Sequence, residues 1–289
     1  MRVRVGDVSL FFDVEGAKLV PEGPRMREKP TLLLLHGGPG FDHSSFKPAF
    51  AGLGDAAQIV YLDHRGNGRS DRSEPSLWTL ARWGDDVRAF CDVLGIEKPV
   101  VLGVSFGGMV AMSYATRHPE HPGKLVLAST TARTRLDRIV AAFAQLGGPE
   151  AGEAARRYWE APGPETLPDY ARHCFPLYTR APRDPDANAR TIWNFEVMFR
   201  FGAGEDQGFD LLPDLARIRC PTLVLAGEDD PITPPGDSED IVAALPPGTA
   251  RFERFANAGH GVWRDAPDAA FRVIREFLGD GTEPGSPPE

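Results

Sequence analysis

Short apolar runs alternate with longer amphipathic stretches along most of the chain. The runs are almost continuously apolar, which is typical of strands that are covered on both faces of a sheet. The predicted strands are residues 31–35, 58–62, 100–102, 125–128 and 222–226, with 251–255 as a weaker last member. Near the N-terminus, two further runs at 3–5 and 8–14 flank Gly6-Asp7 and predict an antiparallel hairpin at the sheet edge.

Helical patterns lie between these strands. They are residues 79–94, which Gly95 ends, and 106–117, 237–245 and 267–278. Because strand and helix alternate, the sequence predicts an α/β fold with a mostly parallel central sheet flanked by helices.

One long stretch, residues 133–213, contains no buried-strand pattern. Its helical segments, near 136–145, 150–159 and 187–201, are separated by Pro- and Gly-rich links. An insertion at this point would cover the carboxyl ends of the strands, where open α/β sheets bind ligands. We therefore expect a core domain of residues 1–132 and 214–278, a helical cap of residues 133–213, and a flexible tail of residues 279–289.

Composition and charge exclude several kinds of partner. The net charge of -9 and the absence of an arginine-rich run argue against nucleic acid. Three widely separated cysteines without a C-x-x-C pattern fit a reduced, cytoplasmic protein without structural zinc. The N-terminus lacks the apolar core of a signal peptide, and no apolar run approaches the roughly 20 residues that span a bilayer. We expect a cytoplasmic protein that does not bind membranes.

The clearest chemical signal is Gly103-Val104-Ser105-Phe106-Gly107, a G-x-S-x-G sequence between a predicted strand and a predicted helix. Such a sharp strand-to-helix turn exposes the serine in a strained backbone conformation. Glycines on either side remove the Cβ atoms that would collide in the turn. The pattern predicts that Ser105 is a nucleophile.

A serine hydroxyl needs a base, and the base needs an orienting acid. His260 is the predicted base, because it follows the last strand within a glycine-flanked loop. The acid is expected between the serine and the histidine, in Gly227-Glu228-Asp229-Asp230-Pro231. Asp230 is our choice because the residue before a proline is held extended. Asp229 is the alternative.

The oxyanion of an acyl-transfer intermediate needs N–H donors. His36-Gly37-Gly38-Pro39-Gly40 follows a buried strand directly, so Gly38 N–H is one predicted donor, with Gly37 as an alternative. The second is Phe106 N–H, next to the nucleophile. The sequence from Asp63 to Ser70 is rich in glycine and charge but lacks a phosphate-loop lysine. There we expect Asp63 and Arg65 to form a buried ion pair that holds neighbouring loops.

Together, these sequences resemble the α/β-hydrolase superfamily over nearly the whole chain. Within it, His-Gly-Gly-Pro-Gly with a helical cap resembles the proline iminopeptidases, which cleave N-terminal proline from peptides and need no cofactor. This chain has Val104 and Phe106 where those enzymes usually have glycine and tryptophan. The resemblance implies that a cap acid binds the substrate's amino group, and Glu196 lies in a similar region, beside Trp193. Alternatively, Glu196 is a solvated helix residue and Trp193 only packs the cap.

The residues therefore predict a hydrolase that uses no metal or other cofactor and forms an acyl-enzyme on Ser105, with His260 and Asp230 completing a triad. A small molecule or short peptide is the expected substrate, and the resemblance favours an aminopeptidase. A carboxylesterase or lactonase for a small apolar acyl group is the alternative, and an apolar cap interior without a buried acid would favour it. A more distant alternative is a receptor-like protein that binds a ligand with very slow turnover.

Overall fold

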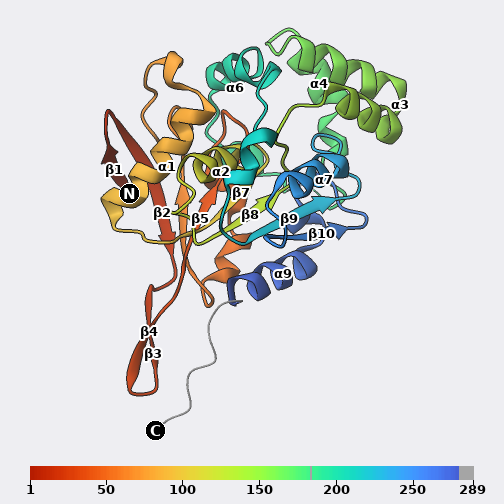
Figure 1. The fold of residues 1–289 in the computed structure, drawn as a ribbon. Coiled ribbons are helices and arrows are strands. Elements are labelled where there is room, and N and C mark those ends of the chain that lie inside the picture. The colour runs from red at the N-terminus through yellow and green to blue at the C-terminus, as the bar shows by residue number, and fades with distance from the viewer. Residues whose placement is uncertain (183, 280–289) are drawn as a thin grey trace.

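The computed structural model describes residues 1–182 and 184–279, and its centre is a sheet of eight strands in the order β1-β2-β6-β5-β7-β8-β9-β10 (Figure 1). The strands are β1 (Arg2–Val5), β2 (Val8–Glu15), β5 (Thr31–Leu35), β6 (Gln58–Leu62), β7 (Val100–Val104), β8 (Lys124–Ala128), β9 (Thr222–Gly227) and β10 (Ala250–Phe255). β1 and β2 are antiparallel to their neighbours, and all pairs from β6 to β10 are parallel. The predicted fold class is confirmed.

Helices cover both faces of this sheet. The helices outside the β8–β9 connection are α1 (Leu80–Leu94), α2 (Phe106–Arg117), α7 (Pro235–Ala244), α8 (Val262–Asp265) and α9 (Pro267–Gly279). On one face, Trp83 of α1 and Val110 of α2 belong to an apolar cluster with Leu33 of β5. On the other face, Trp263 and Phe277 pack with Leu34. Because successive residues of β5 enter opposite clusters and all are buried, this strand is continuously apolar.

In its described residues, the connection between β8 and β9 contains helices joined by loops and no β-strand apart from the isolated bridge between Arg133 and Asp210. It contains α3 (Leu136–Glu160), α4 (Leu167–His173), α5 (Ala187–Arg190) and α6 (Phe195–Gly202). In Figure 1, α3, α4 and α6 gather at one end of the molecule. Part of the segment has an apolar cluster of its own, in which Phe143 and Tyr170 are buried. We keep the name cap for residues 133–213.

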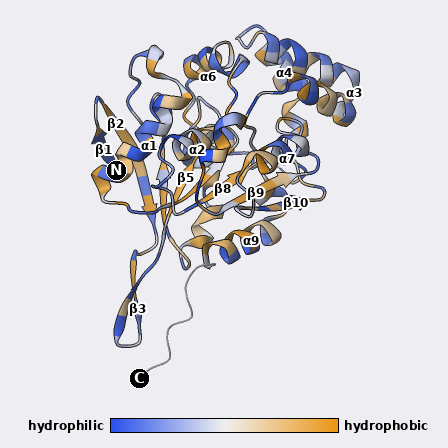
Figure 2. Cartoon of the chain, viewed as in Figure 1, coloured by the Kyte–Doolittle hydropathy of each residue, from blue (hydrophilic) through white to orange (hydrophobic). Residues whose placement is uncertain are grey.

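The cap differs from the prediction in its details. The two helices expected near 136–145 and 150–159 are both present within α3, and they meet at a kink where Gly148 has a non-helical conformation (φ 83°) before Pro149. The helix expected over 187–201 is two short ones, and α4 was not predicted. Figure 2 shows hydrophilic residues along much of α3 and α4, so these helices offer few apolar positions from which a sequence pattern could predict them.

A second small sheet, the hairpin of β3 (Leu19–Glu22) and β4 (Arg25–Glu28), was also missed. It projects from the end of the molecule opposite the cap, and nearly all its residues are exposed (Figure 1). Since it buries no face, it leaves no hydrophobic alternation to detect. Gly279, the first residue of the predicted tail, ends α9, and the rest of that prediction lies outside the described residues. Within the described residues, none of the helices is long and apolar enough to cross a bilayer.

Candidate active site

Ser105 lies in the turn between β7 and α2, and its backbone is strained. Its φ of 54° and ψ of -122° lie outside the backbone regions that residues with a Cβ normally adopt. Two hydrogen bonds hold it there: its N–H donates to the Ala128 carbonyl oxygen (3.0 Å), and its own carbonyl accepts from Thr130 Oγ1 (2.7 Å). The residue is partly exposed, so its hydroxyl is presented at the carboxyl end of the central strands.

The glycines of this turn are required by packing. A Cβ on Gly103 would overlap the carbonyl oxygen of Gly107, and a Cβ on Gly107 would overlap that of Leu35. Backbone atoms cannot move aside as a flexible side chain can, so larger residues would push the turn out of place. The G-x-S-x-G spacing thus reflects three chain segments that meet at the nucleophile.

The structure brings His260 and Asp230 together. His260 Nδ1 lies 2.9 and 3.1 Å from the two carboxylate oxygens of Asp230. The buried carboxylate also accepts hydrogen bonds from the backbone N–H groups of Ile232 and Thr233 and from Thr233 Oγ1. Asp229, the alternative acid, is half exposed and pairs with Arg180 (3.1 Å). The geometry therefore favours Asp230 as the partner of the histidine.

The histidine loop lies beside the nucleophile turn. The N–H of Gly261 donates to Ser129 Oγ (3.1 Å), and Ser129 directly follows Ala128, the residue that binds Ser105 N–H. Because Nδ1 of His260 faces Asp230, its Nε2 is the nitrogen left for the serine or a substrate.

The predicted oxyanion loop, residues 36–40, lies against the same turn. A Cβ built on Gly37 would lie 3.5 Å from Ser105 Cβ, and Gly38 has a φ of 123°, which favours glycine. The N–H of Gly40 donates to Asn67 Oδ1 (2.6 Å). Phe106 is the first residue of α2, where N–H groups have no acceptor within the helix. These features are compatible with the predicted donors Gly38 and Phe106.

Two buried histidines support this loop. His36 Nε2 accepts from His64 N–H (3.3 Å), so its Nδ1 carries the proton and donates to the Gly37 carbonyl (2.7 Å). The two rings lie 4.5 Å apart. Burial lowers the pKa of His36 and lowers that of His64 well below its ordinary value. Both rings are therefore neutral at pH 7.

The expected ion pair between Asp63 and Arg65 is wrong. Asp63 accepts hydrogen bonds from the backbone N–H groups of His43 and Arg69, and its Oδ1 lies 2.7 Å from His43 Nδ1. The buried Arg65 guanidinium instead pairs with Asp7 and Asp86. Both residues hold loops in place, but their charged side-chain partners, His43, Asp7 and Asp86, lie 20 or more positions away, where no local pattern could identify them.

The two cap residues predicted to contact substrate lie on or next to α6. Glu196 is exposed in the first turn of that helix. Trp193 is partly buried, and its ring packs edge-on against Phe41 (4.7 Å) and stacks with Phe195 (5.3 Å). Phe41 follows the oxyanion loop directly, so this part of the cap touches the core close to the site.

The cap contains a buried acid that no sequence pattern indicated. Asp206 is only 5% exposed, and its Oδ1 accepts from Thr134 Oγ1 (3.0 Å) in the connection after β8. Burial raises its pKa to about 7. Its neighbour Glu205 accepts from the N–H of Leu80 (2.8 Å), and burial raises the pKa of Glu205 as well. In the sequence, Glu205-Asp206 looks like two solvated loop residues, and only the tertiary fold buries Asp206 and partly covers Glu205.

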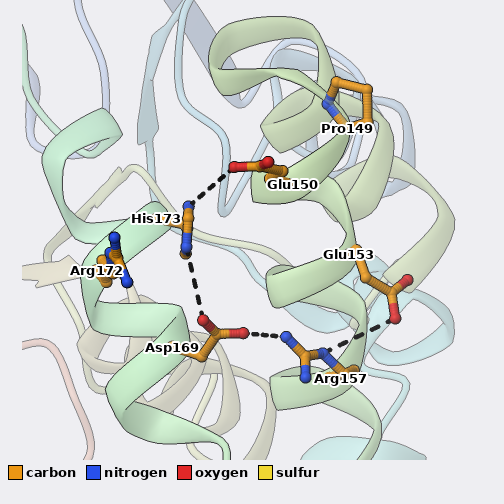
Figure 3. Close-up of a pocket in the computed structure, with 7 residues that line it drawn as sticks. All are labelled: Pro149, Glu150, Glu153, Arg157, Asp169, Arg172 and His173. Carbon is orange, nitrogen blue, oxygen red and sulfur yellow. Dashed lines mark hydrogen bonds and ion pairs between the residues drawn. The ribbon is translucent and has the colours of Figure 1, made fainter.

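A surface pocket of about 510 Å³ lies in the cap between α3 and α4 (Figure 3). Its side chains form an ion-pair chain in which Asp169 connects His173 (3.6 Å) to Arg157, as Figure 3 shows. None of Ser105, Asp230 and His260 lines this pocket.

Comparison with known proteins identifies the family of this chain. Residues 30–265 match the family model of the alpha/beta hydrolase fold, so the chain belongs to that family. It is 29% identical to the proline iminopeptidase PfmaB of Pestalotiopsis fici, over 93% of this chain and 98% of that protein. The proline iminopeptidase-related protein TTHA1809 of Thermus thermophilus superposes with a TM-score of 0.75 at 26% identity, covering 96% of each chain. The protein is thus a hydrolase that resembles the proline iminopeptidases.

The fold also accommodates other chemistry. The enol-lactonase of Burkholderia xenovorans superposes with a TM-score of 0.70 at 21% identity, over 96% of this chain and 99% of that one. At this identity the likeness concerns the fold alone, so the substrate must be argued from the site.

Proposed function

We propose that the protein is a serine hydrolase in which Ser105, His260 and Asp230 form the catalytic triad. The observation that carries this proposal is the Asp230–His260 contact, beside a serine in a strained turn. His260 Nε2 takes the proton from Ser105 as the hydroxyl attacks the substrate carbonyl. Asp230 holds the ring so that Nδ1 keeps its proton, and it stabilises the imidazolium that forms.

The N–H groups of Gly38 and Phe106 bind the oxyanion of the tetrahedral intermediate. His260 then gives its proton to the leaving group, and an acyl-enzyme on Ser105 remains. Water, activated by the same histidine, attacks this ester, and the acid is released with regeneration of the serine.

For the substrate, we propose a short peptide or amide with a free N-terminal amine, so that the enzyme is a proline iminopeptidase-like aminopeptidase. The cap interior contains a buried acid, Asp206, whereas an interior without one would favour an esterase. A buried carboxylate without a cation is unfavourable, and a substrate ammonium would supply the missing charge. Asp206 is better shielded for this role than Glu196, which is exposed to water.

A substrate panel tests both the proposed serine hydrolase mechanism and the proposed specificity for a free N-terminal amine. Prolyl and alanyl anilides with free amines are compared with their N-acetyl forms and with short-chain aryl esters, and Ser105→Ala serves as the blank. Among the anilides we expect cleavage of the free-amine forms only, with loss of that activity on N-acetylation. The triad alone should give weak hydrolysis of the reactive aryl esters, and the blank should cleave none of the substrates. Cleavage of esters alone would indicate the carboxylesterase or lactonase alternative. Tight ligand binding without turnover would indicate the receptor-like one.

Two carboxylate-to-amide variants then locate the amine site. Asp206→Asn should lower kcat/KM for free-amine anilides by about tenfold to a hundredfold, because a charged hydrogen bond contributes roughly 1.5–3 kcal/mol. Its effect on aryl esters should be within about threefold. Glu196→Gln is the matched control and should change neither by more than about twofold. The reverse result, with Glu196→Gln selective for amines, would contradict the choice of Asp206.

A further inference from the structure

A short cap segment, residues 178–181, lies directly on the two loops that carry His260 and Asp230. The carbonyl oxygen of Tyr178 accepts from the backbone N–H of His260 (2.6 Å). The Tyr178 ring also packs edge-on against the imidazole, with the centroids 5.8 Å apart. Arg180 pairs with Asp229, the residue before Asp230. The histidine backbone is therefore held by the cap as well as by the core.

Asp265, at the end of α8, joins the same two segments through its carboxylate. Its Oδ1 accepts from two cap N–H groups, those of Arg180 (3.0 Å) and Ala181 (2.8 Å). Its Oδ2 accepts from the N–H of Gly259 (2.7 Å), the residue before His260. One side chain thus satisfies three backbone donors, and each oxygen faces a different part of the protein. Hydrogen bonds to a carboxylate are stronger than neutral ones, so this junction is firm.

Gly259 is part of this junction, and there is no space for a side chain at its position. A Cβ on this residue would overlap the carbonyl oxygen of Tyr178 and come within 3.5 Å of Asp265 Oδ2. The close approach of the cap backbone to the histidine loop therefore depends on glycine at this position.

We propose that Asp265 is a positioning residue for His260, which ties the catalytic base to cap segment 178–181 so that the placement of one depends on the other. This inference rests on the proposed triad. Asp265 acts through the backbone, because its carboxylate accepts from the N–H groups of Arg180 and Ala181 in the cap and of Gly259 next to His260. A cap that shifts when substrate binds would therefore also shift the base.

Asp265→Asn is the most informative change, because an amide presents only one oxygen. Whichever way it turns, either the cap donors or the Gly259 donor lose their acceptor. Asp268→Asn, the same change at an exposed position three residues later, is the matched control. Gly259→Ala separates the two segments without altering Asp265, and Gly163→Ala, in open space in the cap, is its control.

The readout is the rate at which a fluorophosphonate labels Ser105, measured against pH and alongside thermal unfolding. Labelling needs an activated serine but no knowledge of the natural substrate. We expect Asp265→Asn and Gly259→Ala to label about tenfold to a hundredfold more slowly, as a displaced catalytic group does, and with a shifted pH midpoint. The two controls should stay within about twofold of the wild type.

Wild-type labelling and an unchanged pH midpoint in a folded Asp265→Asn protein would overturn the proposal. If that variant fails to fold, Gly259→Ala decides in the same way. A wild-type protein whose Ser105 is not labelled would instead contradict the proposed triad, so the two failures are distinguishable.

Discussion

Different interactions stabilise the carboxyl edge of the central sheet and the outer surface of the cap. At the edge, buried groups such as Asp63 and Asp230 accept several hydrogen bonds each, and strands on both sides fix the backbone. On the outside of the cap, side chains such as Arg156 form exposed ion pairs with Glu153 and Glu160, which contribute roughly 0–1 kcal/mol each. The proposed catalytic groups therefore lie where several buried hydrogen bonds fix the structure, whereas exposed ion pairs add little stability to the outer surface of the cap.

The largest effect should come from the acid at the core edge. Asp230→Asn keeps the shape of the side chain but donates to His260 Nδ1 and so favours the wrong tautomer. We expect kcat to fall by about 10⁴-fold, as in triads of this type. Asp229→Asn removes only the half-exposed pair with Arg180 and should cost less than about fivefold. Comparable losses in the two variants, measured as kcat on the cleaved substrate, would contradict the assignment.

A smaller but still large effect is expected from the backbone of the same edge. Gly107→Ala places a methyl group against the carbonyl of Leu35 and should lower the free energy of unfolding by about 3 kcal/mol or more. The same substitution at Gly163 in the cap meets nothing closer than 4.0 Å and should change it by less than about 0.5 kcal/mol. Urea unfolding of both variants measures the difference, and equal values would show that the two regions are equally tolerant.

The same contrast explains what the sequence could predict. The strands of the core were placed within a residue or two, since burial on both faces makes β5, β7 and β9 continuously apolar. The catalytic candidates could be named because Ser105 and His260 each need glycines beside them, and glycines in fixed spacing are visible in a sequence.

What could not be predicted depends on contacts between distant residues. The buried Asp206 accepts from Thr134 Oγ1, 72 positions away in the chain, and the pairing of Arg65 with Asp7 and Asp86 also joins residues far apart in the chain. The break in α3 follows from a local signal, Gly148-Pro149, but the short helices of the cap carry too few apolar positions to define their ends.

The smallest predicted effect is a pH dependence of stability that arises in the core. Burial lowers the pKa of His64, so the unfolded chain, with an ordinary pKa near 6.5, binds a proton that the folded protein rejects. The stabilising contribution is complete above about pH 6.5 and is lost as the pH falls, at up to about 1.4 kcal/mol per pH unit. Asp206 has the opposite pH dependence. Its pKa is raised to about 7, so its contribution to the free energy of unfolding is complete below about pH 4 and is lost as the pH rises to about 7.

A single histidine variant isolates the contribution of His64. His64→Gln should flatten the fall in the free energy of unfolding between about pH 6.5 and 5 by up to about 1.4 kcal/mol per unit. Asp206 is unchanged in this variant, so its contribution cancels in the comparison with wild type. If urea unfolding at several pH values gave His64→Gln the wild-type slope, the acid sensitivity would not arise at the buried histidine pair at the core edge.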